Sequence, residues 1–278
     1  MIINNNSKIL HFEPQKINSK EIYIPSNHLS MLPAITKIDD KYYYIKSVKP
    51  KGLINELIGS NLSKKIELNS VDYKIGICDN SLYALSEVFF EPNYSYSYCY
   101  DKYNTTAIEM YLKKRVIYER YYLSYLKMLK NINNKEMLLQ ILKLILIDLK
   151  MGQTDRNDHN IMLKTDNETN ETTLASIYDF EESYEERPSL NEKYYYDNSF
   201  IILRKNFLSL FMFLQHFPFI KEYLKTLCDI SILQVLDEIE KEFQIEFHTE
   251  EKKYYEEKDK EYTSILKRII WVIIRFIL

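Results

Sequence analysis

The residues best suited to chemistry lie between positions 152 and 182, where carboxylates and an amide recur at fixed intervals. This stretch begins Gly-Gln-Thr-Asp-Arg-Asn-Asp-His-Asn-Ile-Met-Leu and ends, after a polar insert, with Ile-Tyr-Asp-Phe-Glu-Glu. Transfer of a phosphoryl group from ATP needs a carboxylate near the acceptor hydroxyl, together with an amide oxygen and a second carboxylate on the bridging metal ion. Asp155, Asn160 and Asp179 supply these three groups in that order.

The flanking residues indicate how these groups are held. Residues 135–151 have helical spacing, with Asn134 as the expected N-cap and Gly152 as the expected stop. Residues 144–147 are Leu-Ile-Leu-Ile, so this helix is apolar nearly all round and is predicted to lie in the core. Asp155 therefore lies on a loop that follows rigid structure, where functional carboxylates are commonly placed.

Two apolar runs after the loop predict a pair of short strands, Ile161–Leu163 and Leu174–Ile177, joined by the polar turn 165–173. That pairing would bring Asn160 and Asp179 together as hard oxygen ligands of the kind that Mg²⁺ prefers. Taken alone, the Asp-x-x-x-x-Asn spacing fits a solvated polar loop equally well. The strands on its carboxyl side favour the functional interpretation.

A phosphotransferase also needs a strand lysine at the nucleotide phosphates and a helix glutamate that holds it. Lys46 lies in the apolar strand predicted at 41–48, and Glu56 lies near the start of the next predicted helix, 53–65. Each has an alternative role: Lys46 as a charged residue that protects a sheet edge, and Glu56 as a partner of the helix dipole. Lys49 competes with Lys46 for the lysine role.

The remaining pattern predicts an α+β chain, rich in strands up to about residue 90 and mostly helical thereafter. Asp39-Asp40 and Asp79-Asn80 are the expected turns, and 93–100 is expected to be a loop. Asp229 is the expected N-cap of one of the later helices. The further predicted strands are 21–25, 71–77 and 81–90, and the further predicted helices are 107–129, 199–216, 229–243 and 250 to the end.

Composition excludes several classes of protein. A net charge of −3 argues against direct nucleic-acid binding, and three widely spaced cysteines without a Cys-x-x-Cys pair give neither a disulfide framework nor a zinc site. The amino terminus lacks a signal-peptide core, so a cytoplasmic location is expected. The apolar stretch 266–278 is shorter than the ~20 residues that span a bilayer. A buried helix is the favoured interpretation of that stretch, over a membrane-surface anchor.

Two short motifs resemble known families. Residues 152–163 resemble the catalytic loop of phosphoinositide 3- and 4-kinase-like enzymes, Gly-Asp-Arg-His-x-x-Asn-Ile-Met. Residues 55–68, which begin Asn-Glu-Leu, resemble the Asn-Glu-x-x-x-x-x-Leu-Ala-x-x-x-Gly-Leu helix of HipA-like serine/threonine kinases. The resemblance extends over roughly residues 20–230 through short motifs rather than continuous identity. It implies a two-lobed protein-kinase-like fold, with a strand-rich N-lobe at 1–90 and a helical C-lobe at 91–278.

The resemblance also implies roles for individual residues. Asp155 would be the catalytic base, Asn160 and Asp179 the metal ligands, Lys46 the phosphate-contacting lysine and Glu56 its partner. The hinge that meets the adenine ring would comprise Ser86, Glu87 and Val88. Ser26 and Ser30 lie in the segment 25–34, which would fill the place of the phosphate loop, and are candidates for phosphate contact or autophosphorylation.

The chain departs from these families at three points. Asn157 stands where both families have a histidine, so His159 is either a catalytic substitute or a solvated loop residue. Glu181 replaces the glycine that usually follows Asp-Phe, which predicts a segment less free to flip and an extra carboxylate near the metal. With only four glycines, the chain has no conventional glycine-rich phosphate loop.

The expected function is therefore that of an ATP- and Mg²⁺-dependent kinase acting on a protein Ser or Thr hydroxyl. A phosphoinositide-type lipid kinase is the first alternative, and a nucleotide-binding pseudokinase with a regulatory role is the second. The HipA likeness further implies a toxin–antitoxin context and an antitoxin-like protein partner. No membrane partner is expected.

Overall fold

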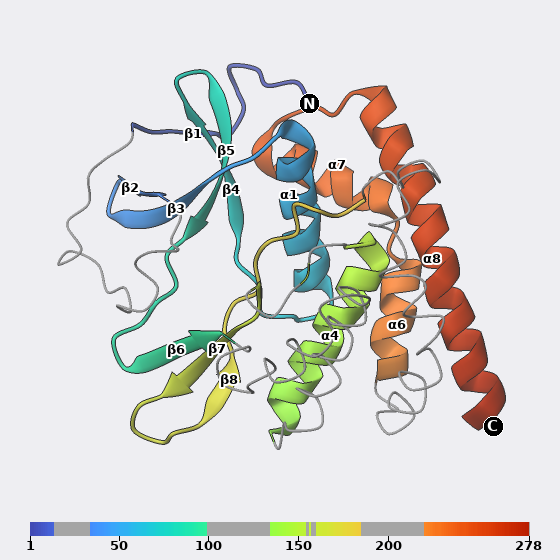
Figure 1. The fold of residues 1–278 in the computed structure, drawn as a ribbon. Helices are drawn as coiled ribbons and strands as arrows, with labels where there is room; N and C mark the ends of the chain where they lie inside the picture. Colours follow the sequence, from blue (N-terminus) through green and yellow to red (C-terminus); the bar gives the residue numbers. More distant parts are fainter. Residues whose placement is uncertain (14–33, 99–133, 154–155, 157–159, 185–219, 278) are drawn as a thin grey trace, which may run out of the picture.

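The computed structural model describes residues 1–13, 34–98, 134–153, 156, 160–184 and 220–277. A five-stranded sheet forms one side of the molecule, in the order β1-β4-β5-β3-β2 (Figure 1). Strands β2 to β5 pair antiparallel, and β1 pairs parallel with β4. The strands are β1 (Leu10–His11), β2 (Ala34–Ile38), β3 (Lys41–Ser47), β4 (Tyr73–Cys78) and β5 (Ser81–Glu87).

Two tight turns fix the register of this sheet. Ile38 pairs with Lys41, and Cys78 pairs with Ser81, so each hairpin has a two-residue loop. The loops are Asp39-Asp40 and Asp79-Asn80, with φ of 55° at Asp39 and of 47° and 61° at Asp79 and Asn80. Asp and Asn tolerate this left-handed conformation, which confirms both predicted turns.

Helix α1 (Pro50–Lys65) lies between the sheet and the helical part of the molecule (Figure 1). It begins three residues before the predicted start, because Pro50 occupies the first turn, where the missing N–H costs nothing. The helix contacts β4 and β5 on one side and α4 (Lys135–Met151) and α7 (Ile232–Phe243) on the other. This two-sided burial explains why most of its residues are buried.

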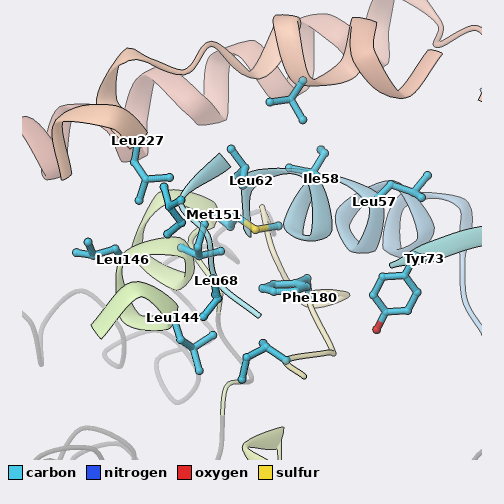
Figure 2. Packing of buried hydrophobic residues seen from close by; sticks show 14 of the residues in the cluster. Leu57, Ile58, Leu62, Leu68, Tyr73, Leu144, Leu146, Met151, Phe180 and Leu227 are labelled. Atoms are coloured by element: carbon cyan, nitrogen blue, oxygen red, sulfur yellow. The ribbon is translucent and has the colours of Figure 1, made fainter. Parts of the chain in front are cut away.

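The helical part consists of α4, α6 (Ile220–Asp229), α7 and α8 (Thr249–Ile277) in the described residues. The predicted caps of α4 are confirmed: the Asn134 side chain accepts from the Met137 N–H at 3.1 Å, and Gly152 has φ of 60°. Leu144 and Ile147 are fully buried, as expected of its apolar run. Figure 2 shows side chains of α1 and α4 gathered around Phe180 and Met151 in one core.

A second sheet has three antiparallel strands, in the order β6-β7-β8. Strands β7 (Met162–Asp166) and β8 (Thr172–Leu174) pair around a polar turn as predicted, but β8 ends at Leu174, where the predicted strand 174–177 begins. Strand β6 (Tyr94–Tyr98) contradicts the loop predicted at 93–100. Its serines suggested a turn, but tyrosine and serine alternate with the period of a strand and Tyr96 is buried against the sheet.

Other boundaries also differ from prediction. Asp229 ends α6 and is not the N-cap of the next helix, because α7 begins after Ser231, which has extended backbone angles. Strand β2 was missed between the expected phosphate segment and the Asp39-Asp40 turn. The strand expected at 21–25 and the helices expected at 107–129 and 199–216 lie outside the described residues. The proposed lobe boundary at residues 90 and 91 falls between β5 and β6 and stays a prediction.

The carboxyl-terminal helix is buried only in part. Leu266 is fully buried, whereas Lys267, Arg268 and Trp271 are exposed, Trp271 to 56%. The expectation of a buried end was therefore wrong at Trp271, because this turn faces solvent on one side. Within the described ranges, none of the helices combines the length and apolarity that crossing a bilayer requires.

Candidate active site

One ammonium group lies among three carboxylates between β3, α1 and the segment after β8. Lys46 Nζ donates to Glu56 Oε1 and to Asp179 Oδ1, both at 2.6 Å, and lies 3.1 Å from Glu181 Oε2. Glu56 is fully buried, whereas the other side chains are about a quarter exposed. The structure thus brings together Lys46, Glu56 and Asp179, and it places Lys46 rather than the exposed Lys49 at the glutamate.

Burial and charge act in opposite directions in this cluster. Burial alone would lower the pKa of Lys46, but the charges of Glu56 and Asp179, and the hydrogen bonds to them, outweigh burial and raise it. Burial raises the pKa of Glu56, against the stabilising effects of Lys46 and of the Phe180 N–H. Lys46 therefore stays a cation at neutral pH, and Glu56 becomes protonated more readily than a solvated glutamate.

The backbone around Asp179 is held by side chains from α1, from β4 and from the turn after α4. The Phe180 N–H donates to Glu56 Oε2 at 2.8 Å, the Asp179 N–H donates to the Tyr73 hydroxyl at 3.2 Å, and Gln153 Nε2 donates to the Asp179 carbonyl at 2.8 Å. Asp179 itself has φ of 68°. A left-handed residue of this kind persists where its surroundings fix it, and such residues cluster at functional sites.

Arg156 ties the loop after α4 to this segment. Its guanidinium donates to the Asp148 carboxylate, with Nε 3.1 Å from Oδ2, and to the Tyr178 carbonyl at 2.6 Å. The same group lies over the Phe180 ring, 5.0 Å from its centroid. The only signal for Arg156 in the sequence was its position next to Asp155. The sequence did not show that Arg156 holds the backbone at Tyr178.

Two glycines of α1 make room for the segment. A Cβ at Gly59 would lie 2.2 Å from Cγ of Phe180, and a Cβ at Gly52 would lie 2.7 Å from Cγ of Glu181. Both glycines lie on the helix face that also carries Glu56, at helical spacings of three and four residues. Two of the four glycines in the chain therefore leave room for this one segment, a role that the sequence alone did not reveal.

The remaining predicted residues lie on or near strands β5 and β7, or outside the described residues. Ser86 is buried in β5, and the Val88 N–H donates to the Tyr42 carbonyl at 2.9 Å. Glu87 is exposed and forms a surface ion pair with Lys41 at 2.8 Å. Asn160 is half-buried, two residues before β7. The described residues do not include Asp155, His159, Ser26 or Ser30.

Oxygen atoms that could take part in a metal site lie on Asp179 and Glu181. Among the described residues, no group of three His, Cys, Asp or Glu side chains could hold a metal ion. Mg²⁺ is commonly bound by one or two protein oxygens together with waters and substrate phosphates, so Asp179, Glu181 and Asn160 are adequate ligands in kind. Asp179 and Glu181 carry more negative charge than Lys46 offsets, which also favours a divalent cation.

Comparisons with known proteins agree with this architecture. No family model and no curated protein matches the sequence. The fold is similar to the Helicobacter pylori proinflammatory kinase CtkA, with a TM-score of 0.60 and 14% identity over 88% of this chain and 95% of that one. It is also similar to Shewanella oneidensis HipA, solved with HipB and operator DNA, with a TM-score of 0.53 and 12% identity over 81% of this chain and 57% of that one. The chain therefore has a HipA-like, two-lobed α+β protein-kinase-like fold, with a small strand-rich lobe and a larger, mostly helical lobe.

Proposed function

We propose that this protein is a kinase that uses ATP and Mg²⁺ to phosphorylate a Ser or Thr hydroxyl of a protein. The observation that carries the proposal is the position of Lys46, bonded at once to the helix carboxylate Glu56 and to Asp179 of the Asp-Phe pair. In kinases a strand lysine held by a helix glutamate contacts the nucleotide phosphates, and the Asp of Asp-Phe binds the metal. The likeness of the fold to the Helicobacter pylori kinase CtkA supports a kinase activity.

Lys46 would contact the α- and β-phosphates while Glu56 keeps its ammonium in place. The ammonium has three protons, so it can keep its bond to Glu56 and direct the others toward phosphate oxygens. Asp179 and Asn160 would hold Mg²⁺, and Glu181 adds a carboxylate beside them. The metal ion, when bound, neutralises charge on the phosphates.

Asp155 would accept the proton of the acceptor hydroxyl. Arg156, the next residue, is anchored to Asp148 and to the carbonyl of Tyr178, the neighbour of Asp179 in the sequence. Positioning of this kind supplies much of the rate acceleration in phosphoryl transfer. His159 is the candidate to assist where Asn157 replaces the usual histidine.

The adenine ring would meet Ser86, Glu87 and Val88, and Ser30 would lie at the phosphates. A protein acceptor is favoured over a lipid because the segment after Tyr184 carries Glu185, Glu186 and Glu192, which would repel an acidic head group. An antitoxin-like protein is the proposed partner, by analogy with the complex of HipA with HipB.

A pseudokinase is the second candidate. Three carboxylates surround Lys46, and Asn157 replaces the loop histidine. In that case nucleotide binding would regulate a partner, without turnover.

Labelled ATP separates these functions. The protein is incubated with γ-labelled ATP and Mg²⁺ alone, with cell-lysate proteins, and with phosphoinositide vesicles. Label on Ser or Thr of the protein itself or of lysate proteins, lost in Asp155→Ala, supports the proposal. Label on lipid indicates the lipid kinase. ATP binding with no labelled product in any arm indicates the pseudokinase and refutes the proposed activity.

A further inference from the structure

Asn55 of α1 holds the segment that carries Asp179 and Glu181. It precedes Glu56 in the helix and is only 1% exposed. Its Nδ2 donates to the carbonyls of Glu181 at 2.7 Å and Ser183 at 2.6 Å. Both protons of the amide are therefore used on this segment.

The oxygen of that amide is bound by Tyr255 of α8. The Tyr255 hydroxyl donates to Asn55 Oδ1 at 2.9 Å and is also 3.4 Å from the Lys51 carbonyl. An amide rotated by half a turn would place its oxygen against two carbonyl oxygens and turn its NH₂ toward Tyr255. The two carbonyls therefore fix the amide orientation, and the Tyr255 hydroxyl satisfies the buried Asn55 Oδ1 in that orientation.

Asn55 and Glu56 hold successive parts of one short segment. Glu56 accepts the Phe180 N–H at 2.8 Å, and Asn55 binds the Glu181 and Ser183 carbonyls. The Glu181 carboxylate lies 3.1 Å from Lys46 Nζ. Loss of the Asn55 contacts would therefore release the side of the segment that places Glu181 beside Lys46.

A second contact from α8 reaches the same segment. The Tyr254 hydroxyl donates to the Tyr184 carbonyl and accepts from Lys51 Nζ at 2.8 Å. The Tyr184 ring packs edge-on against Tyr255, with ring centroids 5.4 Å apart. Figure 1 shows α8 running along the outer side of the helical part, so its first turns link the carboxyl-terminal helix to the site.

We infer that Asn55 and Tyr255 are positioning residues for the Mg²⁺–nucleotide site, and that they make α8 a functional part of it. Neither side chain is placed at the phosphates or the metal; both act through the backbone of residues 181–183. The effect on nucleotide binding rests on the proposed function, whereas the effect on the order of the segment does not.

The test uses Tyr255→Phe in the full-length protein, because it removes one hydroxyl and keeps the ring. Amide hydrogen exchange of residues 179–184 is measured without nucleotide, and KM for Mg-ATP and kcat are measured with it. Loss of one buried hydrogen bond changes an equilibrium constant by about three- to tenfold. We expect exchange to quicken and KM to rise by that factor, with kcat changed less. Asn55→Asp, which keeps the acceptor and loses both donors, should have a larger effect.

Thr263→Val is the matched control. It removes a buried hydroxyl from the same helix, but that hydroxyl contacts Lys150 of α4, at 2.6 Å, rather than the segment. It should lower the midpoint temperature of thermal unfolding without changing the amide exchange of residues 179–184 or the KM for Mg-ATP. Unchanged exchange and unchanged KM in Tyr255→Phe would overturn the inference. Faster exchange in a protein that binds no Mg-ATP would refute the proposed function and leave the positioning role supported.

Discussion

Gly59→Ala reverses the usual effect of replacing a helical glycine. In a helix interior this change normally stabilises by about 0.8–1 kcal/mol. Here the new methyl would lie 2.2–2.7 Å from three atoms of the Phe180 ring, which is fully buried. Overpacking in a core costs about 1–3 kcal/mol, so the net effect should range from neutral to a loss of about 2 kcal/mol.

The ring has little freedom to move away. The Phe180 N–H is bonded to Glu56, and the Arg156 guanidinium lies over the ring. A shift of Phe180 would carry its neighbours Asp179 and Glu181 away from Lys46. A displacement of ~1 Å can cost about 100-fold in rate, so phosphoryl transfer should fall by about 10- to 100-fold.

Urea unfolding and a kinase assay of Gly59→Ala measure both effects, and Phe180→Ala completes a double-mutant cycle. Removal of the ring should make the alanine at 59 favourable again, with a coupling of about 1–3 kcal/mol. Gly52→Ala is the stability control, because its new methyl would contact the Glu181 side chain, which is partly exposed and can rotate away. A Gly59→Ala protein that is more stable by about 1 kcal/mol and fully active would refute the described packing.

Three further predictions concern the charged groups. Asp155→Ala should abolish phosphoryl transfer while ATP binding survives, and Asp179→Ala should weaken Mg-ATP binding itself. Calorimetry measures the binding of Mg-ATP and a kinase assay measures the transfer. An active Asp155→Ala protein would contradict the mechanism. Because burial raises the pKa of Glu56 above 4.5, the folded state binds more protons just above that pH, so this group lowers the free energy of unfolding as pH rises. Urea unfolding between about pH 4.5 and 7 should therefore show a more positive pH slope in Glu56→Gln than in the wild type, and an identical slope would contradict the shift. Arg156→Lys keeps the charge but loses the forked contact with Asp148 and Tyr178, so it should lose about 1–3 kcal/mol of stability and slow phosphoryl transfer; unchanged stability would show that the fork is dispensable.

Short-range patterns predicted much of the fold. The caps of α4 and the two Asp- and Asn-containing hairpin turns each depend on a few neighbouring residues, and the structure has them where the sequence indicated. The β7–β8 pair is also present, but β8 ends at Leu174, where the second predicted strand begins. Strand β6 was missed because its serines outweighed its alternation, and the α6–α7 junction was misplaced because Asp229 is a plausible cap. These errors arise where local signals conflict and tertiary packing decides.

The candidate site was predictable only as a set of residue types. The order of Lys46, Glu56 and Asp179 follows from motif spacing, and the structure places their charged atoms within hydrogen-bond distance. The scaffold behind them was not predictable: Gly59 acts through space on Phe180, and Tyr255 acts from about 200 residues away in the sequence. Such long-range contacts leave no periodic signal in the chain.

Calorimetric titration of Mg-ATP into the wild type, Lys46→Met and Lys74→Met tests the central claim most directly. Lys74 is a matched control, since it lies in the same sheet and pairs with the surface carboxylate of Asp72 at 3.2 Å. The wild type and Lys74→Met should bind Mg-ATP alike, and Lys46→Met should bind at least about tenfold more weakly, because a charged hydrogen bond contributes roughly 1.5–3 kcal/mol. Equal affinity in Lys46→Met, or no binding by the wild type, would contradict the assignment of Lys46, Glu56 and Asp179 to a nucleotide site.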